Sequence, residues 1–564
     1  MKKLYYLILS ILAFSIQISL ISQNRNLTTE FEWAKRAGSS LNPSWQESGK
    51  DITVDNTGHI AAIGDFYNEA TFDTISLYDG RGSFIARMDT GGNYLWVNQI
   101  KGFSTAKAIA SDTDCNYYII GNFYDTIQLG SIFIYPLVSS QGADVFIAKI
   151  DSMGSFIWGQ AVGMPSPYYT DVASDIYINE LDEVYITGSI SGEGSAIFGS
   201  ITVDLSHGSS QEIFIGKMNT DGSFNWVKTA GGNGDASLYN DIAISISGDI
   251  DENIFVTGYY GQDATFGDTT IYSTDRDDVF VTKLDSDGSF LWVRSYGGVD
   301  DDWALSIDVD NNGNAYIAGS FSDDLIFGDE SLISFGSFDI FVLKVSGDGD
   351  ELWAHNAGGE DDWDEGVSVI AVNDSTIYLS GSFKGAAHFG TDDVLSTKIG
   401  SVWYRDIFVS KIDSSGIFIY TKTAGYQYAD FSYSLAIKDS SIYITGTITN
   451  SAYFDDIFVE ALGSQDIFFA KFIESSVDTT VGVHPVSSQN NTDGIIIYST
   501  SGHIKVNITN RLASGVFVYN IEGKLIKHFN CKYGINSIPI HNKGIYIVKV
   551  QNSDSYKIQK VYVH

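Results

Sequence analysis

Phe280-Val281-Thr282-Lys283 combines an aromatic residue, a β-branched residue, a variable residue and a cation. This short strand occurs seven times in the chain, with Phe469 in place of the β-branched residue in the last copy. The copies start at Phe84, Phe146, Phe214, Phe280, Phe341, Phe408 and Phe468, at intervals of 60 to 68 residues. A repeat of this length with strand periodicity indicates propeller blades, because one small sheet cannot bury both of its faces and must pack on neighbours.

Each repeat resolves into four strands. Around Phe341, residues 306–309 alternate in polarity, and the chain turns and returns over residues 315–321, which is a hairpin signal. An irregular stretch that ends at Phe327-Gly328 separates this hairpin from a second one, formed by residues 338–345 and 351–354.

Two further residues recur at the same spacing as the repeat. The second strand carries a glycine, at Gly64, Gly121, Gly188, Gly258, Gly319, Gly381 and Gly446. The fourth strand carries a tryptophan, at Trp96, Trp158, Trp226, Trp292 and Trp353, and Tyr420 replaces it in the sixth copy. Because the aromatic motif, the glycine and the tryptophan recur at the same spacing, the sequence predicts seven blades.

The last copy has no fourth strand, whereas residues 31–38 read as a fourth strand that no third strand precedes. Placing residues 31–38 in the seventh blade closes the ring non-covalently and removes two exposed sheet edges. We therefore expect an all-β fold: a seven-bladed β-propeller of four-stranded blades over residues 31–473, closed by an N-terminal strand.

The repeat also resembles a known family. Gly297-Gly298 through Gly319 contains a Gly-Gly pair, acidic residues, an alternating strand, Asp-x-x-Gly-Asn and Tyr-Ile-x-Gly, which is similar to the SBBP-type β-propeller repeat of bacterial exported proteins. The likeness covers roughly residues 31–473. It implies a fold but no particular activity, because such propellers share none.

The net charge, the N-terminal residues and the cysteines exclude several classes of protein. The 564 residues include 33 Lys and Arg against 70 Asp and Glu, a formal charge of −37, which argues against nucleic-acid binding and against adhesion to anionic lipid by charge alone. Residues 1–23 read as a secretory signal peptide, with a membrane anchor as the alternative, so we expect no transmembrane segment in the mature chain. The cysteines, Cys115 and Cys531, form no disulfide framework.

The end of the chain changes character. Residues 474–490 are polar and lose the repeat phase, which marks a linker. Residues 491–564 contain nine Lys or Arg against three Asp or Glu and read as short strands, so a separate domain with a separate role is the natural inference.

Residues 518–525, 544–550 and 560–563 resemble the C-terminal sorting domain of type IX secretion cargo, although Tyr498-Ser499-Thr500-Ser501 replaces the usual Tyr-Pro-Asn-Pro. The resemblance implies an Ig-like β-sandwich that the type IX secretion machinery recognises as its partner after passage through the periplasm. A generic β-sandwich is the alternative. The matching motif residues are Gly523, Gly544, Tyr546, Lys549 and Lys560.

Carboxylates also recur in phase. Counting seventeen residues back from each second-strand glycine, or sixteen in the last repeat, gives Glu47, Ser104, Asp171, Asp241, Asp302, Asp364 and Asp430. Since they precede the innermost strand, we expect them to circle one mouth of the central channel. Calcium would suit such oxygens. The favoured interpretation is that each carboxylate accepts backbone N–H bonds in its own loop and braces it.

Two neighbouring repeats place a tryptophan among these acids. Trp303 follows Asp301 and Asp302, and Trp363 lies between Asp362 and Asp364. One interpretation is packing between blades. The other is a platform of aromatic rings and carboxylates that binds sugar rings or a basic peptide, because loops on a rigid scaffold carry such sites.

Enzyme signatures are absent from the sequence. It contains no Gly-x-Ser-x-Gly, His-Glu-x-x-His or phosphate loop, and its nine histidines do not follow the repeat. The leading hypothesis is a binding protein, secreted or attached to the outer cell surface, whose ligand is a polysaccharide, a surface protein or a matrix component. The alternatives are an extracellular hydrolase or lyase that acts on polysaccharide through the acidic mouth, and a structural spacer of a surface layer.

Overall fold

A computed structural model describes residues 27–39, 47–138, 142–205, 211–232, 241–360 and 363–476. Nearer the C-terminus it describes residues 495–500, 503–508, 513–520, 524–530, 534–539, 544–552 and 556–563. The expected signal peptide, residues 1–23, lies outside these ranges, as does nearly all of the expected linker. The chain divides into two compact units, Met1–Ser476 and Val477–His564, which are taken in turn.

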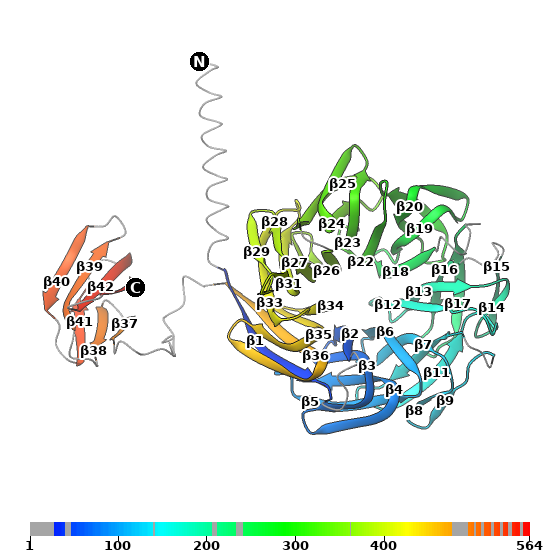
Figure 1. Cartoon of the computed structure of the whole chain (residues 1–564), viewed down its shortest axis with the longest axis horizontal. Helices are drawn as coiled ribbons and strands as arrows, with labels where there is room; N and C mark the ends of the chain where they lie inside the picture. Colours follow the sequence, from blue (N-terminus) through cyan, green and yellow to red (C-terminus); the bar gives the residue numbers. More distant parts are fainter. Residues whose placement is uncertain are drawn as a thin grey trace, which may run out of the picture. The chain divides into compact units, whose positions relative to one another are not determined.

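The first unit is all-β and propeller-like, with antiparallel sheets arranged around a common centre (Figure 1). Its main strands pair in groups of four, which we number along the chain. Group 1 is β2 (Ser48–Val54), β3 (Ile60–Phe72), β4 (Ile75–Met88) and β5 (Tyr94–Lys101); group 2 is β6 (Ser104–Ser111), β7 (Tyr117–Phe123), β10 (Asp144–Ile150) and β11 (Phe156–Val162); group 3 is β12 (Val172–Ile178), β13 (Val184–Ser191), β16 (Gln211–Met218) and β17 (Phe224–Ala230).

The remaining groups follow the same pattern. Group 4 is β18 (Ile242–Gly248), β19 (Ile254–Phe266), β20 (Thr269–Leu284) and β21 (Phe290–Tyr296); group 5 is β22 (Asp302–Val309), β23 (Ala315–Phe327), β24 (Glu330–Val345) and β25 (Glu351–Gly359); group 6 is β26 (Glu365–Asn373), β27 (Thr376–Lys384), β32 (Arg405–Asp413) and β33 (Phe418–Gln427); group 7 is β34 (Phe431–Lys438), β35 (Ser441–Phe454), β36 (Ile457–Ser476) and β1 (Leu27–Ala37).

β1 supplies the fourth strand of group 7. It pairs with β36 from Leu27 opposite Ser476 to Ala37 opposite Ile467. The Trp33 Nε1–H donates to the Thr90 carbonyl of group 1 at 3.1 Å. The other fourth-strand tryptophans make the same bond to the next group: Trp96 to Ser152, Trp158 to Thr220, Trp226 to Ser286, Trp292 to Gly347 and Trp353 to Ser414.

Close backbone approach explains the glycine of the second strand. Gly258 lies opposite Phe280, and a Cβ there would come within 1.9 Å of the Ile242 carbonyl oxygen. The carbonyl projects at this point because the first strand carries a β-bulge between Ala243 and Ser245. The repeat therefore keeps the one residue that has no side chain.

The cation of the repeat forms an internal ion pair over an aromatic ring. Lys283 Nζ lies 3.1 Å from an Asp249 oxygen and 4.7 Å from the Phe255 ring centroid. The equivalent ion pairs are Arg87–Asp55, Lys149–Asp112, Lys217–Glu183, Lys344–Asp310, Lys411–Glu474 and Lys471–Glu32. All seven strand cations are thus neutralised inside the fold.

The expectation of an irregular stretch before Phe327-Gly328 is wrong. β23 and β24 stay paired beyond a bulge between Ser322 and Asp324 and form an outer arm. Asp323 takes a left-handed φ of 62°, which bends the hairpin, and the arm then pairs with the preceding group through Ile326 and Gly297. The long second and third strands of groups 1, 4 and 7 form their arms in the same way. In groups 2, 3 and 6 separate short strands form the arms: β8 (Ile127–Leu129), β9 (Ile132–Ile134), β14 (Gly194–Phe198), β15 (Ile201–Leu205), β28 (Ala386–Phe389) and β29 (Asp392–Leu395), with an added hairpin of β30 (Lys398–Ile399) and β31 (Val402–Trp403).

The second unit contains two antiparallel sheets. One has the order β37 (Ile495–Thr500), β38 (His503–Ile508), β41 (Gly534–Pro539), and the other β40 (Leu525–Asn530), β39 (Ala513–Asn520), β42 (Gly544–Asn552), β43 (Tyr556–Val563). Of the motif residues, Tyr546 is buried, Lys549 is half-buried, Gly544 starts β42, Lys560 pairs with Ile547, and Gly523 lies outside the described residues. No helix with the length and apolarity to cross a bilayer occurs in the described parts of either unit.

Candidate ligand-binding site

The six carboxylates that recur with the repeat, here called the phase-locked carboxylates, lie just before or at the start of the first strand of their groups. Each accepts hydrogen bonds from backbone N–H groups. They are Glu47, Asp171, Asp241, Asp302, Asp364 and Asp430. Asp302 accepts from the Gly298 N–H at 2.8 Å, and Asp364 accepts from Lys384 N–H at 2.7 Å and Gly359 N–H at 3.0 Å. The other amide donors are Ser39 to Glu47, Met164 and Ser191 to Asp171, Gly232 to Asp241, and Tyr426 and Thr449 to Asp430. All six side chains are buried, with at most 5% exposure.

A second buried acid, on the third strand of the preceding group, interacts electrostatically with each of these six carboxylates. In the order of the carboxylates, these partners, which the repeat pattern did not reveal, are Asp466, Asp144, Glu212, Asp278, Asp339 and Asp406. At the junction of groups 1 and 2, serines replace both acids, and Ser83 Oγ in β4 lies 3.2 Å from Ser104 Oγ in β6. The paired replacement indicates that the two positions act together.

Burial determines the protonation of these pairs. It raises the pKa of Asp302 to about 9 and that of Asp278 to about 7, and Oδ1 of each side chain lacks a hydrogen-bond partner. With a pKa of about 9, the Asp302 carboxyl group holds its proton at neutral pH. Within the described ranges, no cluster of three or more His, Cys, Asp or Glu side chains could hold a metal ion.

Trp303 and Trp363 lie together but contact other rings. Their ring centroids are 5.7 Å apart, Phe338 stacks on both, 5.0 Å from Trp303 and 4.8 Å from Trp363, and Arg405 lies 5.5 Å above the Trp363 ring. The ring faces are therefore engaged within the fold. Of the acids predicted beside them, Asp301 pairs with Arg276 at 3.2 Å, and Asp362 lies outside the described residues.

A cavity of about 360 Å³ lies against the first strands of three consecutive groups, β34, β2 and β6. Tyr433, Lys50 and Lys107 hold the same place in these strands, the extra residue of the first-strand bulge. The lining also includes Asp65, Tyr67, Arg81 and Phe431. Side chains from three groups thus converge on one hollow, as in many small-ligand sites.

Three cations face one carboxylate in the described lining of this cavity. Burial lowers the pKa of Lys50, the Asp65 carboxylate opposes that effect, and Lys107 adds to it. Burial raises the pKa of Asp65, which accepts from Ser83 Oγ at 2.9 Å and from the Ala106 N–H at 3.1 Å. The cavity is consequently a positively charged site in an acidic protein.

Aromatic rings hold two of the cations. Lys50 Nζ lies 5.1 Å from the Tyr433 ring centroid. The Arg81 guanidinium lies 4.1 Å from the Phe103 ring and 5.1 Å from the Tyr67 ring, and its Nε is buried without a hydrogen-bond partner. Unlike the seven repeat cations, neither lysine has an ion-pair partner among the described residues.

The repeat pattern did not reveal this site, although the sequence contains a signal for it. Counting fourteen residues back from Gly64 and Gly121 gives Lys50 and Lys107. The acids were found by counting seventeen residues back from the same glycines, and that count does not fall on the two lysines. Arg81 has no comparable signal, because it lies where β4 passes from its arm into the inner part of the group.

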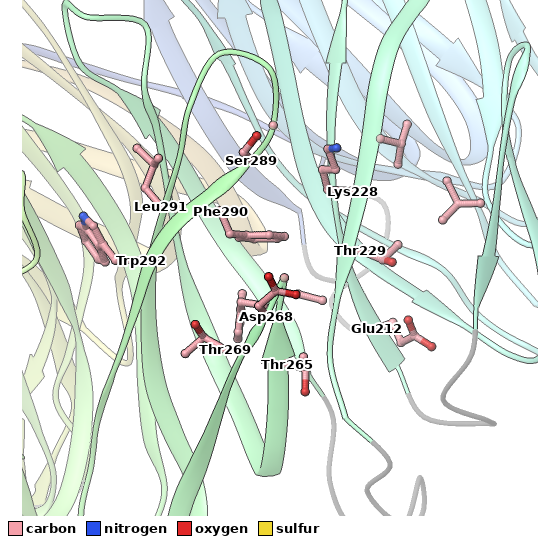
Figure 2. A pocket seen from close by; sticks show the side chains of 16 residues that line it. Glu212, Lys228, Thr229, Thr265, Asp268, Thr269, Ser289, Phe290, Leu291 and Trp292 are labelled. Atoms are coloured by element: carbon pink, nitrogen blue, oxygen red, sulfur yellow. The ribbon is translucent and has the colours of Figure 1, made fainter.

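A larger hollow of about 620 Å³ lies farther out, between group 3 and group 4, and Figure 2 shows Lys228 and Asp268 near Phe290 in its wall. Similar hollows lie between groups 7 and 1, beside Arg36, and between groups 1 and 2, beside Gln128. Since this feature recurs between neighbouring groups, we attribute it to the packing of adjacent fourth strands and arms.

Comparisons with known proteins support a repeat protein without naming its activity. No family model matches the chain. It is 24% identical over 492 residues to an uncharacterized WD repeat-containing protein of Acanthamoeba polyphaga mimivirus, a match that covers 71% of this chain and 35% of that protein. The chain therefore spans about a third of that relative's length.

Two solved structures are also similar. A puromycin hydrolase is 9% identical, with 83% of this chain and 60% of that one covered and a TM-score of 0.39. PorZ, a surface component of the type IX secretion system of Porphyromonas gingivalis, is 11% identical, with 94% and 100% covered and a TM-score of 0.16. Scores this low assign neither an activity nor a partner to this chain.

Proposed function

We propose that this protein is a secreted or cell-surface seven-bladed β-propeller that binds an extracellular partner without changing it chemically. Groups 1 to 7 are its blades, the ring covers residues 31–473, and β1 closes it. After a linker over residues 474–490, residues 491–564 form an Ig-like sorting domain that the type IX secretion machinery recognises. The resemblance of residues 518–525, 544–550 and 560–563 to such domains supports this route.

One observation carries the binding role: the cavity at β34, β2 and β6 gathers aromatic and polar side chains from three groups. By contrast, the phase-locked acids brace their own loops through backbone amides. Tyr67, Phe431 and Tyr433 provide apolar ring surface with adjacent polar groups, which suits a sugar ring. The ligand class is therefore an extracellular polysaccharide or a glycosylated surface partner.

The same cavity favours binding over hydrolysis. Most glycoside hydrolases use a pair of carboxyl groups on either side of the scissile bond. Asp65 is the carboxylate in the described lining of the cavity, and Ser83 and Ala106 already engage it. The buried acid pairs of the other groups are nearly closed to solvent and cannot reach a polysaccharide.

The test is a glycan array probed with the purified full chain and with the double variant Tyr67→Ala/Tyr433→Ala. We expect the double variant to lose binding. Tyr272→Ala is the matched control, because Tyr272 is 72% exposed on the outer arm formed by β19 and β20. Equal binding by both variants would place the ligand elsewhere, shortened glycan products would favour the hydrolase, and no binding at all would favour the spacer.

A further inference from the structure

The charge of the cavity differs from that of the chain. Lys50, Lys107 and Arg81 line it, against Asp65, in a protein with a formal charge of −37. Lys50 and Lys107 occupy equivalent positions in adjacent first strands, so their like charges face the same hollow. Like charges in a partly buried site repel each other unless an anion compensates them.

The rest of the fold shows how this protein treats its buried cations. Each of the seven strand cations has a carboxylate within 4 Å, as Lys149 has Asp112 at 3.1 Å. Lys50, which is half-buried, and Lys107, which is exposed, have no such ion pair within the described residues. An anion that enters the cavity would supply the acceptor that these two ammonium groups lack.

We infer that this cavity binds a carboxylate-bearing sugar unit of an extracellular polysaccharide, an inference that rests on the proposed function. The Arg81 guanidinium lies 4.1 Å from the Phe103 ring centroid and 5.1 Å from the Tyr67 ring centroid, and these two contacts restrict its orientation in the cavity wall. A planar guanidinium edge matches the two oxygens of a carboxylate. Lys50 and Lys107 add charge, and the Tyr433 ring borders the sugar.

Charge over the whole ring favours a sugar over an acidic protein. Residues 1–490 carry a formal charge of −43, so a broad acidic partner surface would meet many carboxylates outside the cavity. At physiological salt, charges are screened beyond about 8 Å. A saccharide chain that places one carboxylate in the cavity avoids most of this repulsion, whereas an acidic polypeptide or a densely sulfated polymer does not.

The experiment measures binding of the full chain to oligogalacturonate, to a neutral dextran of equal length, to dextran sulfate and to poly-glutamate. We expect oligogalacturonate to bind and to weaken with added salt. Lys50→Met and Lys107→Met should each weaken it at least tenfold, because each removes a charge-assisted contact. Lys50→Arg should retain most of the affinity.

The matched control is Lys228→Met. Lys228 lies in the outer hollow of Figure 2, so this variant removes the same charge from the molecule but none from the cavity. We expect unchanged affinity, and the thermal midpoint of each variant checks folding. A second readout is the pKa of Lys50, followed by NMR of the dimethylated amine, which should rise when oligogalacturonate binds near Asp65, Lys107 and Arg81.

The outcomes separate this inference from the proposed function. Equal binding of dextran and oligogalacturonate, or equal loss in Lys228→Met, would overturn the anionic sugar while leaving a binding propeller. Preference for poly-glutamate or for dextran sulfate would overturn the uronate class. If Tyr67→Ala/Tyr433→Ala and wild type bind every ligand alike, or bind none, the proposed site itself is wrong.

Discussion

The buried carboxyl pairs make the free energy of unfolding of the protein depend on pH. Burial raises the pKa of Glu47 and Asp302 to about 9 and that of Asp364 to about 8, whereas a carboxyl group in the unfolded chain titrates near pH 4. A raised folded-state pKa gives stability that is fully present below the unfolded pKa and is lost as the pH rises through the folded pKa.

We therefore predict that the free energy of unfolding falls as the pH rises from about 4 to about 9. Denaturant unfolding at a series of pH values measures it. Asp302→Asn should flatten this fall, because the amide stays neutral and its carbonyl can still accept from the Gly298 N–H. Asp55 has the opposite effect on stability. Although burial raises its pKa, hydrogen bonds from Thr57, Tyr117 and Arg87 lower that pKa to about 2. The stabilisation that Asp55 contributes is therefore lost as the pH falls toward 2.

Calcium is the control for this interpretation. If the acids brace loops and share protons, calcium should not change the melting temperature at neutral pH. A shared cation would stabilise by about 2.7 kcal/mol at a hundredfold excess over its dissociation constant. Stabilisation of that size, abolished in Asp241→Asn/Asp302→Asn, would contradict the brace and would restore the metal interpretation of the six acids.

A second prediction concerns the glycine of the second strand. Gly258→Ala should lower the free energy of unfolding by about 1–3 kcal/mol, because the new Cβ would lie 1.9 Å from the Ile242 carbonyl oxygen and the strands must shift. Gly80→Ala is the control, since a Cβ at Gly80 meets nothing within 4 Å. Chemical denaturation measures both variants, and similar losses would contradict the close packing at Gly258, because the smaller backbone entropy of alanine in the unfolded chain favours folding.

At the scale of strands, the positions of residues that recur with the repeat were predictable from the sequence. The meeting of side chains from different groups in one cavity was not. The phase of Phe, Gly, Trp and Asp located most strand pairs, because each residue acts within its own group or on its neighbour. The outer arms were missed because a left-handed residue such as Asp323 interrupts the alternation. The cavity was missed because Lys50 and Lys107 occupy bulges, which add a residue to the count and break the pattern.

Bonds between first strands also bear on closure of the ring. Ser434 Oγ donates to Asp51 Oδ1 at 2.6 Å, across the junction of group 7 and group 1. Asp51 in turn accepts from the Ile109 N–H of group 2 at 2.7 Å. Comparable bonds join groups 3 to 7 in order, from Ile246 to Asp175, Ile307 to Ser245, Val369 to Ser306 and Leu435 to Ser368. The 7–1 junction is therefore held in the same way as most of the others.

Deleting residues 27–38 tests the closing strand. The truncated chain would lose the β1–β36 pairing and the Trp33–Thr90 hydrogen bond, and would expose an edge of β36. We predict a loss of several kcal/mol in the free energy of unfolding, together with a tendency to associate. A synthetic peptide of residues 27–38 added in trans should restore part of the stability, and an unchanged thermal midpoint would argue against closure by β1.

For the whole molecule, division of labour between the two units follows from charge and contacts. The chain splits at Ser476, and residues 491–564 carry a formal charge of +6 against −43 on residues 1–490. The repeat phase also stops before this boundary. Two units that differ in periodicity and in the sign of their charge are expected to fold independently and to serve different steps, ligand binding in the first and export in the second.

Removal of residues 491–564 separates these roles. Because the repeat phase and the closing β1–β36 pair lie within residues 27–476, we predict that the truncated chain keeps the thermal midpoint and the glycan binding of the ring. Without the sorting domain, it should accumulate in the periplasm, which cell fractionation measures. Residues 491–564 fused to an unrelated periplasmic reporter should carry that reporter out of the cell. Normal export of the truncated chain would overturn the sorting role, while loss of its thermal midpoint would show that the ring depends on the second unit.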